Sequence, residues 1–151
     1  MVSDPESTIL LLALGRLERW GKAIRAGKHR ARSLCYKGIK YTPSRWFSDL
    51  SHADQQRLGR GRRHLEQLGL IGPFRRYGVD GRVMHFRPTP KGVEIAIRLR
   101  RRVGDPVDVD ALTAALDAAD WATDEHRAVL AAFCPPGAAA PQSRERDCES
   151  A

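Results

Sequence analysis

The sequence is poor in several features that define common protein classes. Its three cysteines, Cys35, Cys134 and Cys148, include no CxxC pair, which argues against a disulfide scaffold or a zinc site and fits a reducing cytoplasm. The apolar run at residues 9–15 (ILLLALG) is too short to span a bilayer, and acidic residues precede it where a signal peptide would be basic. We therefore expect a cytoplasmic protein with no membrane partner.

Short catalytic motifs are also missing. The chain contains no HExxH, GxSxG or P-loop sequence, and its five histidines show no metal-ligand spacing. Asp105, Asp108 and Asp110 form a D-x-x-D-x-D cluster, but this cluster begins a predicted helix, where the helix dipole and capping explain acidic residues without a metal. We expect no enzymatic activity, no bound metal and no cofactor.

Acidic residues are scarce in the first two thirds of the chain. Residues 1–104 hold 23 lysines and arginines against 8 aspartates and glutamates, a net charge of +15. Residues 105–151 hold 3 against 10, a net charge of −7, and the two parts sum to the +8 of the whole chain. A basic body of this kind favours a polyanionic partner, nucleic acid before membrane.

Apolar periodicity and capping signals predict the secondary structure. The first elements are a helix over 7–26 with Ser7 as N-cap, a basic stretch over 28–37 that is either a short helix or a loop, a very short strand over 39–41, and helices over 43–49 and 52–68. Beyond Gly69 the period becomes alternating, which predicts a β-hairpin with its turn at 78–81. The later elements are strands over 71–77 and 82–87 and helices over 89–102, 108–119 and 123–133.

The segment Arg57–Ile71 (RLGRGRRHLEQLGLI) places four arginines in its first seven residues. On a helical wheel its leucines and Gly61 fall within an arc of about 80°, and Arg60 and Arg63 lie opposite them. A flexible basic linker would not show this separation. We infer that Gly61 lets the preceding helix pack closely, whereas the outward Gly59 leaves room for an approaching backbone.

A helix, a tight turn, a polar-faced helix and a basic hairpin follow one another in the order of a winged helix-turn-helix. In that arrangement helix 52–68 enters the major groove, and the hairpin over 72–87 contacts the DNA backbone or the minor groove. Glutamine can pair with adenine and arginine with guanine. Asp54 is also placed on the exposed N-terminal half of this helix. The candidate DNA-binding residues are Ser44, Arg45, Gln55, Gln56, Arg57, Arg60, Arg63, Gln67, Arg75, Arg76 and Arg82.

Residues 64–92 (HLEQLGLIGPFRRYGVDGRVMHFRPTPKG) resemble the recognition-helix end, the wing and the next helix start of MarR-like winged-helix regulators. That family typically shows a leucine-x-x-x-GLI stretch, a charged wing with a D-x-R tip, and then L-T-x-x-G. Pro88 departs from the pattern, since it replaces the apolar residue before the threonine. The resemblance implies binding of double-stranded DNA, often as a homodimer, with regulation of transcription as the commonest use.

The predicted fold class is therefore mainly α with a small β-hairpin (α+β), a winged helix-turn-helix with flanking helices. Its segments are an N-terminal helix and basic segment (1–38), the winged helix-turn-helix domain (39–103), an acidic helical extension (104–134) and a tail expected to be disordered (135–151). The extension and the N-terminal helix either form a homodimer interface together, or the extension folds over the basic face and competes with DNA. Its apolar residues favour the packing role.

Three functions remain open at this point. The first is a sequence-specific DNA-binding protein, most simply a transcriptional regulator. The second is a winged helix of replication or mobile-element biology that binds DNA or RNA without specificity. The third is a module that docks on an acidic protein. For the basic stretch 28–37, a phosphate contact and a solvated loop are equally compatible with the sequence.

Overall fold

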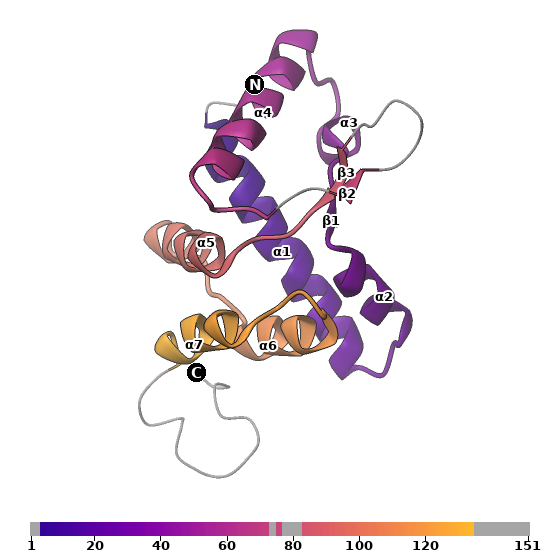
Figure 1. The fold of residues 1–151 in the computed structure, drawn as a ribbon, viewed down its shortest axis with the longest axis vertical. Coiled ribbons are helices and arrows are strands. Elements are labelled where there is room, and N and C mark those ends of the chain that lie inside the picture. Colours follow the sequence, from indigo (N-terminus) through magenta and orange to yellow (C-terminus); the bar gives the residue numbers. More distant parts are fainter. Residues whose placement is uncertain (1–3, 73–74, 77–82, 135–151) are drawn as a thin grey trace.

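The computed structural model describes residues 4–72, 75–76 and 83–134 (Figure 1). Over these residues the molecule is mainly helical with a small antiparallel sheet, as the α+β prediction requires. None of the described helices is long and apolar enough to cross a membrane. The elements are α1 (Pro5–Arg25), α2 (Arg30–Lys37), β1 (Ile39–Lys40), α3 (Pro43–Trp46), α4 (His52–Gln67), β2 (Arg75–Arg76), β3 (Val83–Phe86), α5 (Pro90–Arg102), α6 (Val109–Ala118) and α7 (Asp124–Ala132).

Helix α1 begins earlier than the sequence suggested. Ser7 is not its N-cap: Asp4 is, and its carboxylate accepts hydrogen bonds from the Ser7 backbone N–H at 3.4 Å and from the Ser7 hydroxyl at 2.7 Å. Pro5 takes the first helical position, where its missing N–H is not needed. The aspartate–proline pair therefore overrides the serine two residues further on.

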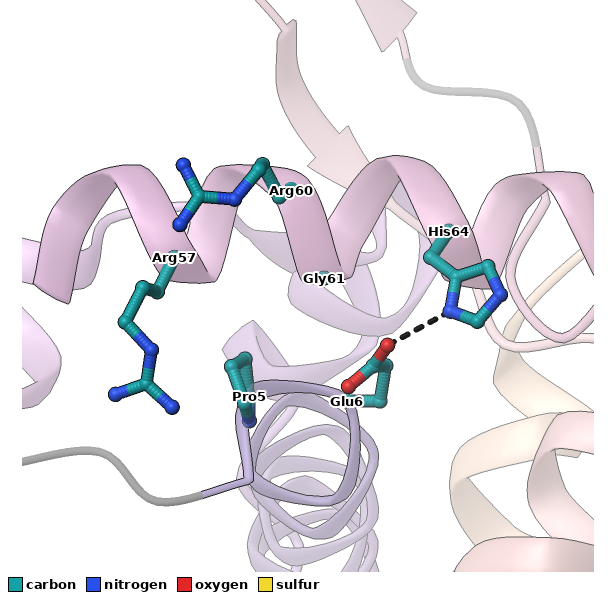
Figure 2. Close-up of a pocket in the computed structure, with 6 residues that line it drawn as sticks. All are labelled: Pro5, Glu6, Arg57, Arg60, Gly61 and His64. Atoms are coloured by element: carbon teal, nitrogen blue, oxygen red, sulfur yellow. Dashed lines mark hydrogen bonds and ion pairs between the residues drawn. The ribbon is translucent and has the colours of Figure 1, made fainter.

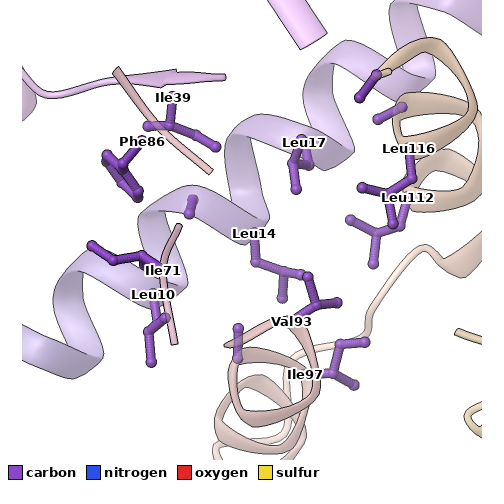
Figure 3. Close-up of a cluster of buried hydrophobic side chains, with 14 of the residues drawn as sticks. Leu10, Leu14, Leu17, Ile39, Ile71, Phe86, Val93, Ile97, Leu112 and Leu116 are labelled. Atoms are coloured by element: carbon purple, nitrogen blue, oxygen red, sulfur yellow. The ribbon is translucent and has the colours of Figure 1, made fainter. Parts of the chain in front are cut away.

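The apolar side of α1 forms the centre of the hydrophobic core. Its leucines lie between the sheet on one side and helices α5 and α6 on the other, as Figure 3 shows. Fully buried side chains come from each of these elements: Leu14 and Leu17 from α1, Phe86 from β3, Ile97 from α5 and Leu112 from α6. One continuous core thus joins the N-terminal helix, the central segments and the acidic extension.

The sheet has the strand order β1-β3-β2, and both pairings are antiparallel. The short strand predicted at residues 39–41 is confirmed as β1, which pairs Ile39 with Phe86. The described parts of the hairpin strands are β2 and β3, and residues 73–74, the segment 77–82 with the expected turn, and the tail after residue 134 lie outside the described residues. The basic stretch 28–37, left open by the sequence, forms helix α2.

Helix α3 ends at Trp46, earlier than predicted, because Phe47 adopts an extended backbone with φ −135° and ψ 141°. Helix α4 ends as predicted before Gly69, whose φ of +74° lies in the left-handed region that favours glycine. Leu68 is the C-cap and is 56% exposed, so its predicted place on the buried arc is wrong. Leu68 lies at the edge of that arc, and as the C-cap it is followed by no further turn of helix.

The chain that leaves α4 is clamped against the start of α5. The Thr89 hydroxyl donates to the Gly69 carbonyl at 2.7 Å and accepts from the Gly92 backbone N–H at 3.1 Å. A Cβ atom at Gly92 would overlap the carbonyl oxygen of Leu70. The glycines and threonine that carry the MarR-like resemblance therefore have a structural role here, since they fix where the hairpin leaves α4 and where it enters α5.

A largely buried ion pair between α1 and α5 also holds the start of the acidic extension. The Glu18 carboxylate of α1 forms an ion pair with the Arg100 guanidinium of α5, with 2.8 Å between nitrogen and oxygen. It also accepts a hydrogen bond from the Asp108 backbone N–H at 2.8 Å. Arg100 in turn donates to the Pro106 carbonyl at 3.1 Å. Because α6 begins directly after Asp108, these contacts set its direction across α1.

Helix α6 crosses α1 at a glycine. A Cβ atom at Gly21 would overlap the backbone of Ala111, including its carbonyl oxygen, so the two helices approach closely only because this side chain is absent. Gly15 lies in the same helix, but the nearest atom to its Cβ position is 3.9 Å away, at the end of the Arg100 side chain.

Substituting these two glycines by alanine should change stability in opposite directions. Gly21→Ala should lower the free energy of unfolding by roughly 1–3 kcal/mol, as overpacking does, whereas Gly15→Ala should raise it by up to about 1 kcal/mol through helix propensity. Urea unfolding followed by circular dichroism measures both. Equal effects at the two positions would contradict the close crossing of α1 and α6.

Candidate nucleic-acid interface

Helix α4 packs on the first turn of α1. Leu58 and Leu65 are buried, and a Cβ atom at Gly61 would lie 2.8 Å from the Pro5 side chain and 3.4 Å from the Glu6 backbone nitrogen. Gly61 does permit a close approach, as predicted, but its partner is α1 and not the preceding helix α3. The contact joins residues far apart in the sequence, so local periodicity could not identify it.

The same junction contains a hollow of about 320 Å³ between α1 and α4 (Figure 2). Arg57, Arg60 and His64 line it from α4, and Pro5 and Glu6 line it from α1. The His64 ring nitrogen Nδ1 lies 2.7 Å from the Glu6 carboxylate, which ties the two helices together across the hollow. Sequence reasoning missed this tie, although the spacing of His64 from Arg57 and Gly61 places these residues on one edge of α4.

The opposite edge of α4 is held by aromatic residues. The Arg62 guanidinium lies 5.4 Å from the centre of the Tyr41 ring, and this ring meets Trp46 of α3 edge-on at 5.2 Å. Burial raises the pKa of Tyr41 above its usual value, and the nearby Arg62 charge opposes that shift. Arg62 also pairs with Glu66 of the same helix at 3.5 Å, and its contact with Tyr41 helps to hold this edge of α4.

Between these two edges α4 exposes a polar face. Five of the predicted DNA-binding residues are exposed on it: Gln55, Gln56, Arg60, Arg63 and Gln67. Within the described part of the chain, neither Arg60 nor Arg63 forms an ion pair. The outward Gly59 has only the Arg63 side chain near its Cβ position, at 3.7 Å, so the helix surface there is open.

Asp54, on this helix, differs from the prediction. Asp54 is only 8% exposed, so it does not belong to the outer face. Its backbone N–H is capped by the Ser51 hydroxyl at 3.0 Å, and its carboxylate pairs with Arg57 at 3.4 Å. Arg57 is therefore half-buried at the edge of the face and partly neutralised.

The other predicted contacts lie beside α4. Ser44 and Arg45 are exposed on α3, the helix that precedes it in the chain. Arg75 and Arg76 form strand β2, and only their backbone is described. Arg82 lies outside the described residues. The structure thus brings the α3 and α4 residues into one region and gives no side-chain geometry for the hairpin arginines.

This surface offers hydrogen-bond donors and positive charge. In residues 4–72, 75–76 and 83–134, no three His, Cys, Asp or Glu side chains are grouped as a metal ion would require. No protein-family model, curated protein or solved structure matches the chain. Function must therefore be argued from the surface itself.

The end of the hairpin is anchored by a buried histidine of α7. Nε2 of the His126 ring is 2.9 Å from the carbonyl oxygen of Pro88. Nδ1 of the same ring accepts a hydrogen bond from the Thr123 backbone N–H at 3.0 Å. The imidazole is therefore neutral and donates through Nε2. Burial lowers the pKa of His126, and the hydrogen bond to Pro88 opposes this shift. Pro88, the departure from the MarR-like pattern, is thus the point where α7 docks.

His126 predicts a pH dependence of stability. Because its pKa is lower in the folded than in the unfolded chain, its contribution is fully present above the unfolded value of about 6.5 and is lost as the pH falls below it toward the folded value. One proton gives at most about 1.4 kcal/mol per pH unit. Urea unfolding between pH 8 and pH 5 should show this loss, and His126→Gln should flatten it. An unchanged slope in the variant would contradict the assignment.

Proposed function

We propose that this protein is a winged-helix protein that binds double-stranded DNA and acts as a transcriptional regulator. The observation that carries the proposal is the exposed polar face of α4, where Arg60 and Arg63 have no acidic partner in the described part of the chain while both edges of the helix are anchored. A major-groove helix needs a rigid support and uncommitted donors.

The order of the elements supports the winged-helix assignment. Helices α2, α3 and α4 with strand β1 precede the β2–β3 pair, and β1 completes a three-stranded antiparallel sheet with that pair. In this proposal α4, within residues 52–68, reads the major groove, and the hairpin over 72–87 contacts the backbone or the minor groove. Ser44 and Arg45 of α3 contact the adjacent phosphates.

A homodimer is not required by this proposal. The apolar residues of α6 and α7 that a dimer interface would use, such as Leu112, Leu116 and Leu130, are buried within one chain. A dimer that binds paired half-sites would therefore have to use other surfaces.

The proposal is tested by titrating a labelled 30-base-pair random duplex with the full chain at several salt concentrations. Fluorescence anisotropy should show salt-steep binding. On a random duplex, binding is mainly electrostatic, so the two arginines act there chiefly through phosphates. Arg60→Ala/Arg63→Ala should therefore weaken binding about tenfold or more and reduce the salt slope by about 2, at roughly 0.9 per lost phosphate contact.

The matched control is Lys91→Ala/Arg102→Ala, which removes the same charge from exposed positions of α5. Equal loss in the two variants would mean that net charge alone drives binding and would overturn the role of α4. Selection from a random duplex library then separates a regulator from an unspecific binder, since regulators prefer their site by about a thousandfold or more.

A further inference from the structure

A second basic surface lies at the other end of α1. No aspartate or glutamate occurs between Arg19 and Ser48, a segment with nine lysines and arginines. The α2 surface, as we call it, consists of the exposed cations at the end of α1, in the connection to α2, on α2 and on β1: Arg25, Lys28, Arg30, Arg32, Lys37 and Lys40.

This surface gathers six exposed cations on a segment that holds no acid of its own. Some arginines elsewhere pair with acids, as Arg100 does with Glu18 and Arg98 with Glu94. On the α2 surface no cation forms an ion pair with any residue that the structure describes. Asp120 is exposed beside Trp121, which docks on α2, yet it too forms no ion pair with these cations.

The helix that presents these charges is held firmly. Ala31 and Cys35 are buried in the core, and the Cys35 carbonyl accepts the Trp121 indole N–H at 2.8 Å. The Tyr36 carbonyl accepts Arg87 at 3.1 Å. On the exposed side, Leu34 and Tyr36 are 44% and 46% exposed among the cations. A fixed helix with unpaired cations loses less conformational entropy when it binds a partner than a flexible basic loop does.

The α2 surface is separate from the proposed DNA face of α4. Helix α4 packs on the first turn of α1, and α2 follows its last turn, so the two lie toward opposite ends of α1 (Figure 1). At 1.5 Å per residue the span from Pro5 to Arg25 is about 30 Å. A single duplex that touched both surfaces would need about nine base pairs or more between them, at 3.4 Å each.

We propose that the α2 surface binds the phosphate backbone of duplex DNA, as a sequence-independent contact in addition to α4. Lysine and arginine neutralise phosphates and release counterions, which adds affinity without reading bases. The chemistry favours a polyanion because the cations are many, uncompensated and spread around an exposed helix. With only Leu34 and Tyr36 among them, the surface has little apolar area for a protein or a membrane.

The experiment uses the full chain, the same 30-base-pair duplex and a triple variant, Arg30→Gln/Arg32→Gln/Lys37→Gln. Glutamine keeps a helix propensity close to that of lysine and arginine, so α2 should remain folded; circular dichroism checks this. The control triple, Lys91→Gln/Arg101→Gln/Arg102→Gln, removes the same charge from exposed positions of α5 that form no ion pair in the described chain. The α2 triple should reduce the salt slope of binding by about 2 to 3, and the control by less than 1.

The outcomes separate this proposal from the role of α4. If the α2 triple weakens DNA binding and Arg60→Ala/Arg63→Ala does not, the α2 surface is supported and the α4 face is overturned. If only Arg60→Ala/Arg63→Ala weakens DNA binding, the α4 face is supported and the α2 surface is overturned. An α2 triple that behaves like its control overturns the proposal. Two other results would also overturn the proposal. In each, the triple variant keeps its DNA binding but loses either binding to anionic phosphatidylserine vesicles or self-association measured by light scattering.

Discussion

The burial of one side of α1 is the constraint on which the rest of the structure depends. The helix is met by α4 at its first turn, by α5 along its middle and by α6 near its end. Two of these contacts use glycine: Gly61 admits Pro5, and Gly21 admits the backbone of Ala111. A missing Cβ at each crossing brings helix axes closer than larger side chains would allow. The length of α1 therefore sets the separation between α4 and α2.

The few acids of the basic region explain which cations are left exposed. Glu6, Glu18, Asp54 and Glu66 each contact a basic side chain that joins or borders packed elements. Glu6 and Glu18 thus join two helices, whereas Asp54 and Glu66 pair with arginines of their own helix, α4. Cations without such a partner, among them those on the outer face of α4 and on α2, keep their full charge at the surface, where long-range attraction of a polyanion acts. The ion pairs therefore show which basic residues hold the fold together and which can bind a polyanion, a distinction that the amino-acid composition alone does not make.

Much of this arrangement was predictable from local signals. The α+β class, strand β1, the glycine end of α4 and the outward Arg60 and Arg63 follow from periodicity and capping, which act within a few residues. The failures have different causes. Asp54 falls within the buried arc of the helical wheel, one turn before Leu58, so periodicity alone accounts for its burial, whereas Leu68 lies at the edge of that arc, where the helix ends. The contacts of Gly61 with Pro5 and of His64 with Glu6 join distant segments, and no pattern in either segment specifies the other.

The acidic extension has a structural explanation that changes how its role can be tested. Its negative charge lies largely at helix starts: Asp108 caps α6, and Asp124 and Glu125 occupy the first turn of α7, where the helix dipole favours acids. Its apolar residues complete the core against α1 and α5, toward the end of the molecule away from α4. Removing the extension would expose the apolar side of α1 and leave Glu18 and Arg100 without their backbone partners. A truncated chain would therefore report on folding, and only substitutions of its exposed acids can test whether it competes with DNA.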